Sequence, residues 1–107
     1  MKHSIVTDYE GISIFSGAPA TDHHHLIFGN GLRELADQDG LWIPLTASEH
    51  TSSSVGTIYQ VHGNPAAQWL SKIAGQLAWE RHEIALTGCS EAEARQRFMK
   101  RYGRNYC

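Results

Sequence analysis

Three consecutive histidines, His23, His24 and His25, stand directly before the apolar residues 26–28 and most constrain how this chain can fold. The Leu-Ile-Phe run is typical of a buried strand, so we expect the imidazoles to lie at the end of a strand, which is a rigid element. Neutral imidazole is the commonest protein ligand for transition metals, and it transfers protons readily near pH 7. The triplet therefore predicts a metal-binding or proton-transferring site beside a strand.

Two further histidines, His50 and His62, follow along the chain. An alternative interpretation is that all five imidazoles are solvated surface residues without a shared role. The adjacency of three of them before a strand favours the functional interpretation. Strand alternation places His23 and His25 on one face and His24 on the other.

The length of 107 residues is that of one domain with a modest core. The apolar runs are shorter than the ~20 residues of a membrane span, and the N-terminus lacks the apolar core of a signal peptide. We therefore expect a soluble, cytoplasmic protein with no membrane partner. Cys89 and Cys107 form no CxxC pair, which argues against a zinc ribbon or a disulfide scaffold.

The charges are unevenly distributed, although the net charge is only −2. Residues 94–107 contain five basic side chains and no acid, so all 11 acids lie in residues 1–93. A basic element on an acidic body is typical of a phosphate-binding surface. It is equally consistent with a solvated helix face whose cations pair with the acids of the body. The five basic residues are Arg95, Arg97, Lys100, Arg101 and Arg104.

The first half of the chain predicts short strands joined by loops. Residues 4–16 alternate around a polar turn, which is typical of a β-hairpin. Residues 29–40 begin with Gly-Asn-Gly and end with Asp-Gly, which predicts a loop. Residues 41–45 predict a second apolar strand that lies or ends at a sheet edge, because Pro44 has no N–H to donate.

Capping signals predict the helices. Thr46 and Glu49 fit a capping box, which places His50 in the first turn of a helix. Residues 52–57 are as typical of a loop as of a continuation of that helix.

The second half of the chain predicts two longer helices. One begins at Asn64-Pro65 and runs to about residue 82 or 84, with Gly75 as a point where another backbone packs close. The other begins with a capping box at residues 90–93 and stops at Gly103. Its inner face is expected to carry Ala94, Phe98 and Tyr102.

The order of these segments resembles the HNH endonuclease superfamily, whose core is a ββα-metal unit. The resemblance covers residues 13–64 and is strongest to the compact phage and prophage branch that includes the recombination-enhancement nucleases. It implies a single α+β domain, with an N-terminal hairpin and loop in residues 1–20, a metal and catalytic core in residues 21–64 and a helical part in residues 65–107. The segments that carry it are residues 16–20, the histidine pair, residues 29–31, residues 43–50 and residues 62–63.

This resemblance implies a metal-dependent endonuclease that nicks or cleaves DNA. It implies one divalent metal ion, with zinc expected in the purified protein and magnesium, manganese or nickel as further candidates for activity. The partner is DNA, and the branch also suggests a recombinase.

The resemblance assigns roles to individual residues. Counted back from residues 29–31, the histidine pair falls on His24, a metal ligand, and His25, the general base. Counted forward from residues 19–20, it falls on His23 and His24 instead, and both registers stay open. His50 matches the ligand on the helix, and His62 matches the last metal ligand or a phosphate contact.

Two further assignments concern catalysis and nucleic-acid binding. Asp39 takes the place of the asparagine that ties down the loop between the strands, and it counts with His24 and His25 as a catalytic candidate. The expected nucleic-acid contacts are Arg33, Arg97, Lys100, Arg101 and Arg104.

The chain departs from the family pattern in three ways. Ser13/Ser16 and Thr46/Glu49 occupy the places of two zinc-binding CxxC pairs, so apolar packing is expected to hold the hairpin instead of a structural zinc. The two later histidines are 12 residues apart and not four, and the asparagine is replaced. These departures keep open a catalytically degenerate zinc-binding module that binds DNA or acts as an adaptor. A third reading is a helical interaction protein whose histidines are incidental.

Overall fold

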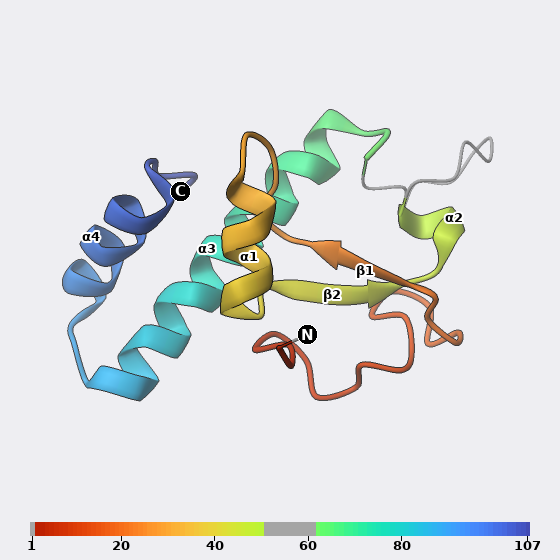
Figure 1. The fold of residues 1–107 in the computed structure, drawn as a ribbon, viewed down its shortest axis with the longest axis horizontal. Coiled ribbons are helices and arrows are strands. Elements are labelled where there is room, and N and C mark those ends of the chain that lie inside the picture. Colours follow the sequence, from red (N-terminus) through yellow and green to blue (C-terminus); the bar gives the residue numbers. More distant parts are fainter. Residues whose placement is uncertain (1, 51–61) are drawn as a thin grey trace.

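The computed structural model describes residues 2–50 and 62–107, so residues 52–57 lie outside the described residues (Figure 1). A two-stranded antiparallel sheet lies beside a long helix, and a further helix covers the other side of that helix. This mixture agrees with the predicted α+β class. The elements are β1 (Asp22–His25), α1 (Leu32–Asp39), β2 (Trp42–Leu45), α2 (Ala47–His50), α3 (Pro65–Thr87) and α4 (Glu91–Tyr102).

The histidine triplet lies inside β1 and not at the mouth of a strand over residues 26–28, which corrects the expectation from sequence. His24 pairs with Ile43 of β2, and His25 pairs with Trp42. Leu26 follows the strand and is buried, and its N–H donates to the carbonyl of Leu41 (2.9 Å). The apolar run therefore enters the core directly after the strand ends.

The predicted loop over residues 29–40 is wrong, because most of this segment forms α1. Gly31 (φ 83°) precedes the helix, and Gly40 (φ 71°) ends it with an N–H that donates to the carbonyls of Ala36 and Asp37. Both conformations are left-handed, where glycine is favoured. The glycines thus mark the two ends of a helix that buries Ala36.

The predicted long helix is confirmed as α3. The Asn64 side chain accepts hydrogen bonds from the N–H groups of Ala66 and Ala67, which satisfies two free donors of the first turn. A close approach at Gly75 is also present, but to side chains and not to another backbone: a Cβ there would lie 2.8 Å from Cγ1 of Ile27. The buried face of α3 is mostly polar and consists of Ser71, Gly75, Gln76 and Glu80.

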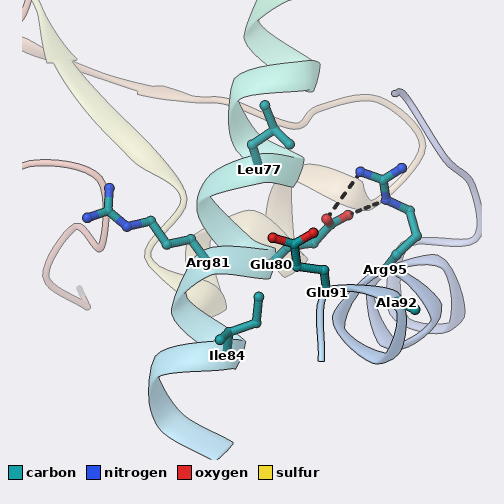
Figure 2. Close-up of a pocket in the computed structure, with 7 residues that line it drawn as sticks. All are labelled: Leu77, Glu80, Arg81, Ile84, Glu91, Ala92 and Arg95. Atoms are coloured by element: carbon teal, nitrogen blue, oxygen red, sulfur yellow. Dashed lines mark hydrogen bonds and ion pairs between the residues drawn. The ribbon is translucent and has the colours of Figure 1, made fainter. Parts of the chain in front are cut away.

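The predicted second helix is confirmed as α4, with the capping box of Ser90 and Glu93 formed. It buries the expected Ala94, Phe98 and Tyr102. Figure 2 shows how α3 and α4 are joined across the hollow between them by Glu80 and Arg95. The Glu80 carboxylate accepts from Nε (2.8 Å) and Nη2 (3.2 Å) of Arg95.

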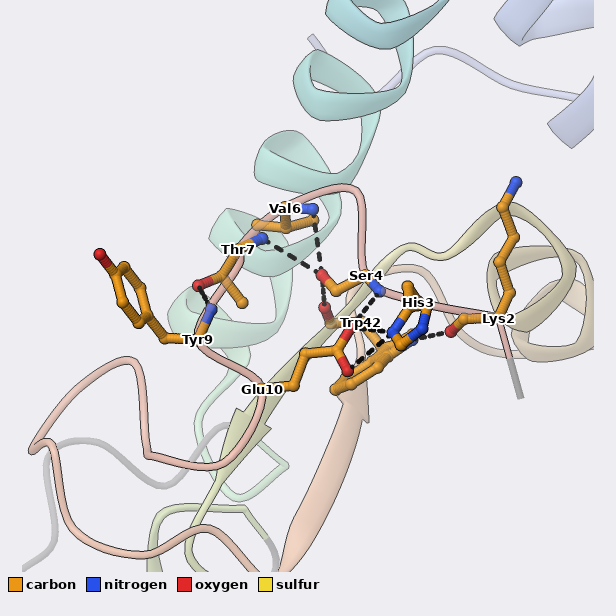
Figure 3. A network of polar contacts seen from close by, with 8 residues as sticks. All are labelled: Lys2, His3, Ser4, Val6, Thr7, Tyr9, Glu10 and Trp42. Atoms are coloured by element: carbon orange, nitrogen blue, oxygen red, sulfur yellow. Dashed lines mark hydrogen bonds and ion pairs between the residues drawn. The ribbon is translucent and has the colours of Figure 1, made fainter.

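The predicted hairpin over residues 4–16 does not form. Side chains accept hydrogen bonds from several of its N–H groups (Figure 3), and Ile5 and Ile14 donate theirs to the backbone carbonyls of Gly40 (2.9 Å) and Pro44 (3.1 Å). The Ser4 hydroxyl donates to the Trp42 carbonyl (2.7 Å) and accepts from the N–H of Val6 (3.0 Å). The described part of the segment shows a single isolated bridge, between Ile12 and Pro19.

The four positions that correspond to the family's CxxC pairs meet around one carboxylate. Glu49, only 6% exposed, accepts from the hydroxyl of Ser13 (2.6 Å) and from the N–H of Thr46 (2.9 Å), which also confirms the predicted capping box. Ser16 contributes a further hydrogen bond to Glu49. The expectation of apolar packing is therefore wrong: a hydrogen-bonded carboxylate holds this loop.

The apolar core lies where α1 and α4 face each other, beside residues that directly follow β1. The main core cluster contains Ile27, Ala36, Leu41, Phe98, Tyr102 and Tyr106.

Among the residues that the structure describes, no helix combines the length and apolar character of a membrane span.

Candidate metal centre

His24, His50 and His62 meet at one point, and their potential ligand atoms all lie within 4.8 Å of one another. The ring centroids are separated by 5.1 Å (His24–His50), 5.0 Å (His24–His62) and 4.9 Å (His50–His62). They come from β1, from the last residue of α2 and from the segment before α3. Of the two registers left open by the sequence, this geometry favours the one with His24 as ligand and His25 beside it, because His23 instead stacks on Trp42 (4.0 Å between centroids).

The buried His24 ring offers one free lone pair to this cluster. Its Nε2 lies 2.8 Å from the Ser71 hydroxyl, which itself donates to the Leu26 carbonyl (2.8 Å). Since the hydroxyl proton is already used, Nε2 of His24 carries the hydrogen and donates it. Nδ1 is then an acceptor, and it is buried without a hydrogen-bond partner. A bound cation would satisfy this atom, so the residues present fit a metal ion.

The electrostatics keep the rings of His24 and His62 neutral, which is the form that binds metal. Burial lowers the pKa of His24 most, and together with the neighbouring His62, His50 and His25 it brings that pKa to about 3. The pKa of His62 is also lowered, first by burial and then by His50 and Arg33. Both imidazoles therefore present lone pairs at neutral pH.

Asp22 orients His50, a role that sequence reasoning missed. Its Oδ2 lies 3.0 Å from Nδ1 of His50, and this hydrogen bond lowers the pKa of the Asp22 carboxyl. Nδ1–H therefore donates to the carboxylate, which leaves Nε2 of His50 free for a metal. The only signal in the sequence was an acid directly before the histidine triplet.

Backbone hydrogen bonds and an aromatic ring hold His62. Its N–H donates to the His50 carbonyl (3.3 Å), and its own carbonyl accepts from the Gln68 side chain (2.8 Å). The Phe28 ring lies 4.8 Å from the imidazole, centroid to centroid. The first turns of α3 thus carry both Gln68, which positions His62, and Ser71, which orients His24.

His25 lies on the face of β1 opposite to His24 and contacts α1. Its Nε2 lies 2.9 Å from Oδ1 of Asp37, and its Nδ1 accepts from Nε of Arg33 (3.4 Å). Because arginine can only donate, Nε2 of a neutral His25 carries the hydrogen and donates it to Asp37. The charge of Arg33 also lowers the pKa of His62, although less than burial and His50 do. Sequence reasoning missed Asp37 because it missed α1.

Asp39 lies in a different network. Its carboxylate accepts from Trp79 Nε1 (2.9 Å), from Arg101 Nε (2.7 Å) and from the Tyr102 hydroxyl (2.7 Å). It ties the segment between the strands, as the resemblance implies, but to α3 and α4. The structure does not bring it to the histidine cluster.

Several of the expected nucleic-acid contacts are engaged in ion pairs. Arg97 pairs with Glu83 (3.4 Å) and Arg101 with Asp39 (2.7 Å), as in the alternative where α4 pairs with the acids of the body. Lys100 is exposed. Arg104 lies over the Tyr106 ring, 4.8 Å from its centroid.

Comparison of the chain with protein-family models finds no matching family. Comparisons with curated proteins and with solved structures likewise find no match.

Proposed function

We propose that this chain is a metal-dependent DNA endonuclease of the HNH type. The observation that carries the proposal is the convergence of His24, His50 and His62, two of which have ring nitrogens held by a hydroxyl and a carboxylate so that the other nitrogen is free. Three protein ligands leave room for water or substrate at a zinc-like ion, which is typical of catalytic and not of structural sites.

A divalent ion at these imidazoles would act as a Lewis acid toward the phosphate oxygens of a nucleic acid. His25 is the proposed general base. Asp37 holds its Nε2–H, so Nδ1 is the atom that takes a proton from water. Arg33 donates to that atom through a long hydrogen bond of 3.4 Å. When the Arg33 guanidinium turns to a substrate phosphate, Nδ1 becomes available.

Two structural features support the HNH assignment. The strands β1 and β2 pair antiparallel, and β2 is followed by a short helix that ends in a candidate ligand; this is the order of a ββα-metal unit, with α1 inserted between the two strands. In addition, the four positions at which many HNH proteins carry zinc-binding CxxC pairs lie together in this structure. They are occupied by Ser13, Ser16, Thr46 and Glu49.

A plasmid-nicking assay with magnesium, manganese, nickel and zinc tests the proposal. His24→Ala should lose both bound metal and cleavage. His25→Ala should keep the metal and lose about 10²-fold or more in cleavage rate, because a general base acts on the transition state. His82→Ala is the matched control, since it removes an α3 imidazole outside the cluster. Full cleavage by both the His24 and the His25 variants would contradict the nuclease.

A zinc-stabilised DNA-binding or adaptor module is the second candidate. The specific observation in its favour is that both ring nitrogens of His25 are already hydrogen-bonded. Chelation separates the two candidates: loss of the folded circular-dichroism signal indicates a structural metal, whereas loss of cleavage alone indicates a catalytic one.

A further inference from the structure

A row of cations and aromatic rings begins at the metal centre. The Phe28 ring contacts both His24 (5.7 Å) and His62 (4.8 Å), measured between centroids. On the same ring lies Nζ of Lys72, 4.7 Å from its centroid. Lys72 directly follows Ser71, the residue that orients His24, so α3 places this ammonium group one ring away from the proposed site of cleavage.

The row continues onto the chain end, which returns toward the first half of α3 (Figure 1). Lys72 Nζ also lies 5.8 Å from the Tyr106 ring, and the Arg104 guanidinium lies 4.8 Å from the same ring. Arg104 lies 5.8 Å from the ring of Trp69, whose side chain is 45% exposed. We call Phe28, Lys72, Tyr106, Arg104 and Trp69 the cation–aromatic track.

The cations of the track differ from the arginines of α4. Arg95, Arg97 and Arg101 are each paired with a carboxylate. Within residues 2–50 and 62–107, neither Lys72 nor Arg104 forms an ion pair with an acid. An aromatic ring positions a cation without neutralising it, so both groups keep their charge and N–H donors for an outside anion.

We propose that the cation–aromatic track binds an unpaired nucleic-acid strand next to the bond that is cut, an inference that rests on the proposed nuclease function. Lys72 and Arg104 contact phosphates of that strand, and Trp69 stacks on a base. An unpaired strand is favoured over a duplex because an exposed indole stacks on a base only where that base is accessible. The binding surface is then the first half of α3 with the chain end, and not the α4 face expected from sequence.

The test measures binding of labelled oligonucleotides to the full chain in chelator, so that it does not depend on metal or cleavage. Single-stranded DNA, single-stranded RNA of the same sequence and duplex DNA are compared over a range of salt. For Lys72→Ala with Arg104→Ala, the slope of log affinity against log salt should fall by about 0.7 for each lost contact to the single strand. Trp69→Ala should weaken single-strand binding about tenfold, mainly through lost stacking.

The matched control removes two charges from α4, Arg97→Ala with Lys100→Ala, and should leave the salt slope unchanged. Lys72→Arg with Arg104→Lys keeps the charges and should retain the slope, which excludes misfolding as the cause. An unchanged slope in the track variant, or an equal loss in the α4 variant, overturns the inference. Tighter binding of duplex than of single strands also overturns the inference. Comparison of single-stranded DNA with single-stranded RNA shows which of the two the track prefers.

The same data separate the two proposals. If the parent protein cleaves DNA while the track variant binds single strands like the parent, the proposed role of the track is wrong and the proposed nuclease function stands. If the parent never cleaves but the track variant loses single-strand affinity, the proposed nuclease function is wrong and the track remains a nucleic-acid-binding surface.

Discussion

Single hydrogen bonds decide which ring nitrogen His24 and His50 present to the metal centre. Asp22 takes the Nδ1–H of His50, and Ser71 takes the Nε2–H of His24. Without these partners each neutral ring could adopt either tautomer, and one of the two tautomers of each ring would point a hydrogen at the metal. Residues outside the ligand set therefore determine whether three histidines act as a site.

Replacement of Asp22 by Asn should weaken metal binding. An amide can still reach Nδ1 of His50, but it lacks the charge that raises the basicity of the ring. We expect metal affinity to fall about 10- to 100-fold with little loss of stability. Competition with a chromophoric chelator measures the change. Ser48→Ala, an exposed neighbour of His50 on α2, serves as control and should bind metal like the parent. Unchanged affinity in Asp22→Asn would rule out this role.

At the scale of elements, α3 packs so closely against the residues that follow β1 that position 75 of this helix has no room for a Cβ. A Cβ on Gly75 would lie 2.8 Å from Cγ1 of Ile27 and 2.9 Å from Cβ of Leu26. Leu26 and Ile27 are both buried and follow β1 directly. The contact thus sets the distance between α3 and the strand that carries His24.

Gly75→Ala should therefore destabilise the fold, although alanine is the better helix former by about 1 kcal/mol. The clash should outweigh that gain and cost about 1–3 kcal/mol of unfolding free energy. Urea denaturation measures it. The reverse change at the exposed neighbour, Ala74→Gly, should cost about 1 kcal/mol by propensity alone. An increase in stability in Gly75→Ala would show that the helix can move away.

At the scale of the whole molecule, Asp39 joins three helices. It lies at the end of α1 and accepts from Trp79 of α3 and from Arg101 and Tyr102 of α4. Burial raises the pKa of the Tyr102 hydroxyl well above its ordinary value of 10.0, and the hydrogen bond to Asp39 raises it further. This network makes the assembly of the helical part dependent on a neutral tyrosine.

The fold should therefore lose stability in alkali. Above pH 10 the unfolded chain releases the Tyr102 proton while the folded protein keeps it, so the unfolding free energy falls as pH rises from there. Urea denaturation between about pH 8 and pH 11 measures this loss, and Tyr102→Phe should reduce it. Tyr102→Phe should also cost about 1 kcal/mol at neutral pH through the missing hydrogen bond. Tyr9→Phe, at a site 73% exposed, should keep the parent's pH dependence. An equal alkaline loss in Tyr102→Phe would refute the role of this hydroxyl.

Features encoded locally were predictable from the sequence. The capping residues Asn64 and Ser90 specify the starts of α3 and α4, because the hydrogen bonds that they make reach only two or three residues along the chain. The resemblance implied the ligand set His24, His50 and His62, with the register of the histidine pair left open, and these three side chains do meet in space.

Features that depend on a distant partner were decided only by the tertiary structure. The partners of His24 and His50 lie 47 and 28 residues away, and no local pattern specifies them. The N-terminal segment forms no hairpin, because Ser4 finds an acceptor on Trp42 that alternation cannot anticipate. The sequence likewise does not show which cations are paired with a carboxylate. Arg101 and Arg104 look alike in the sequence, yet Asp39 neutralises Arg101, whereas Arg104 lies over an aromatic ring and keeps its charge. Periodicity and capping act over a few residues, whereas burial and charge pairing depend on which segments the fold brings together.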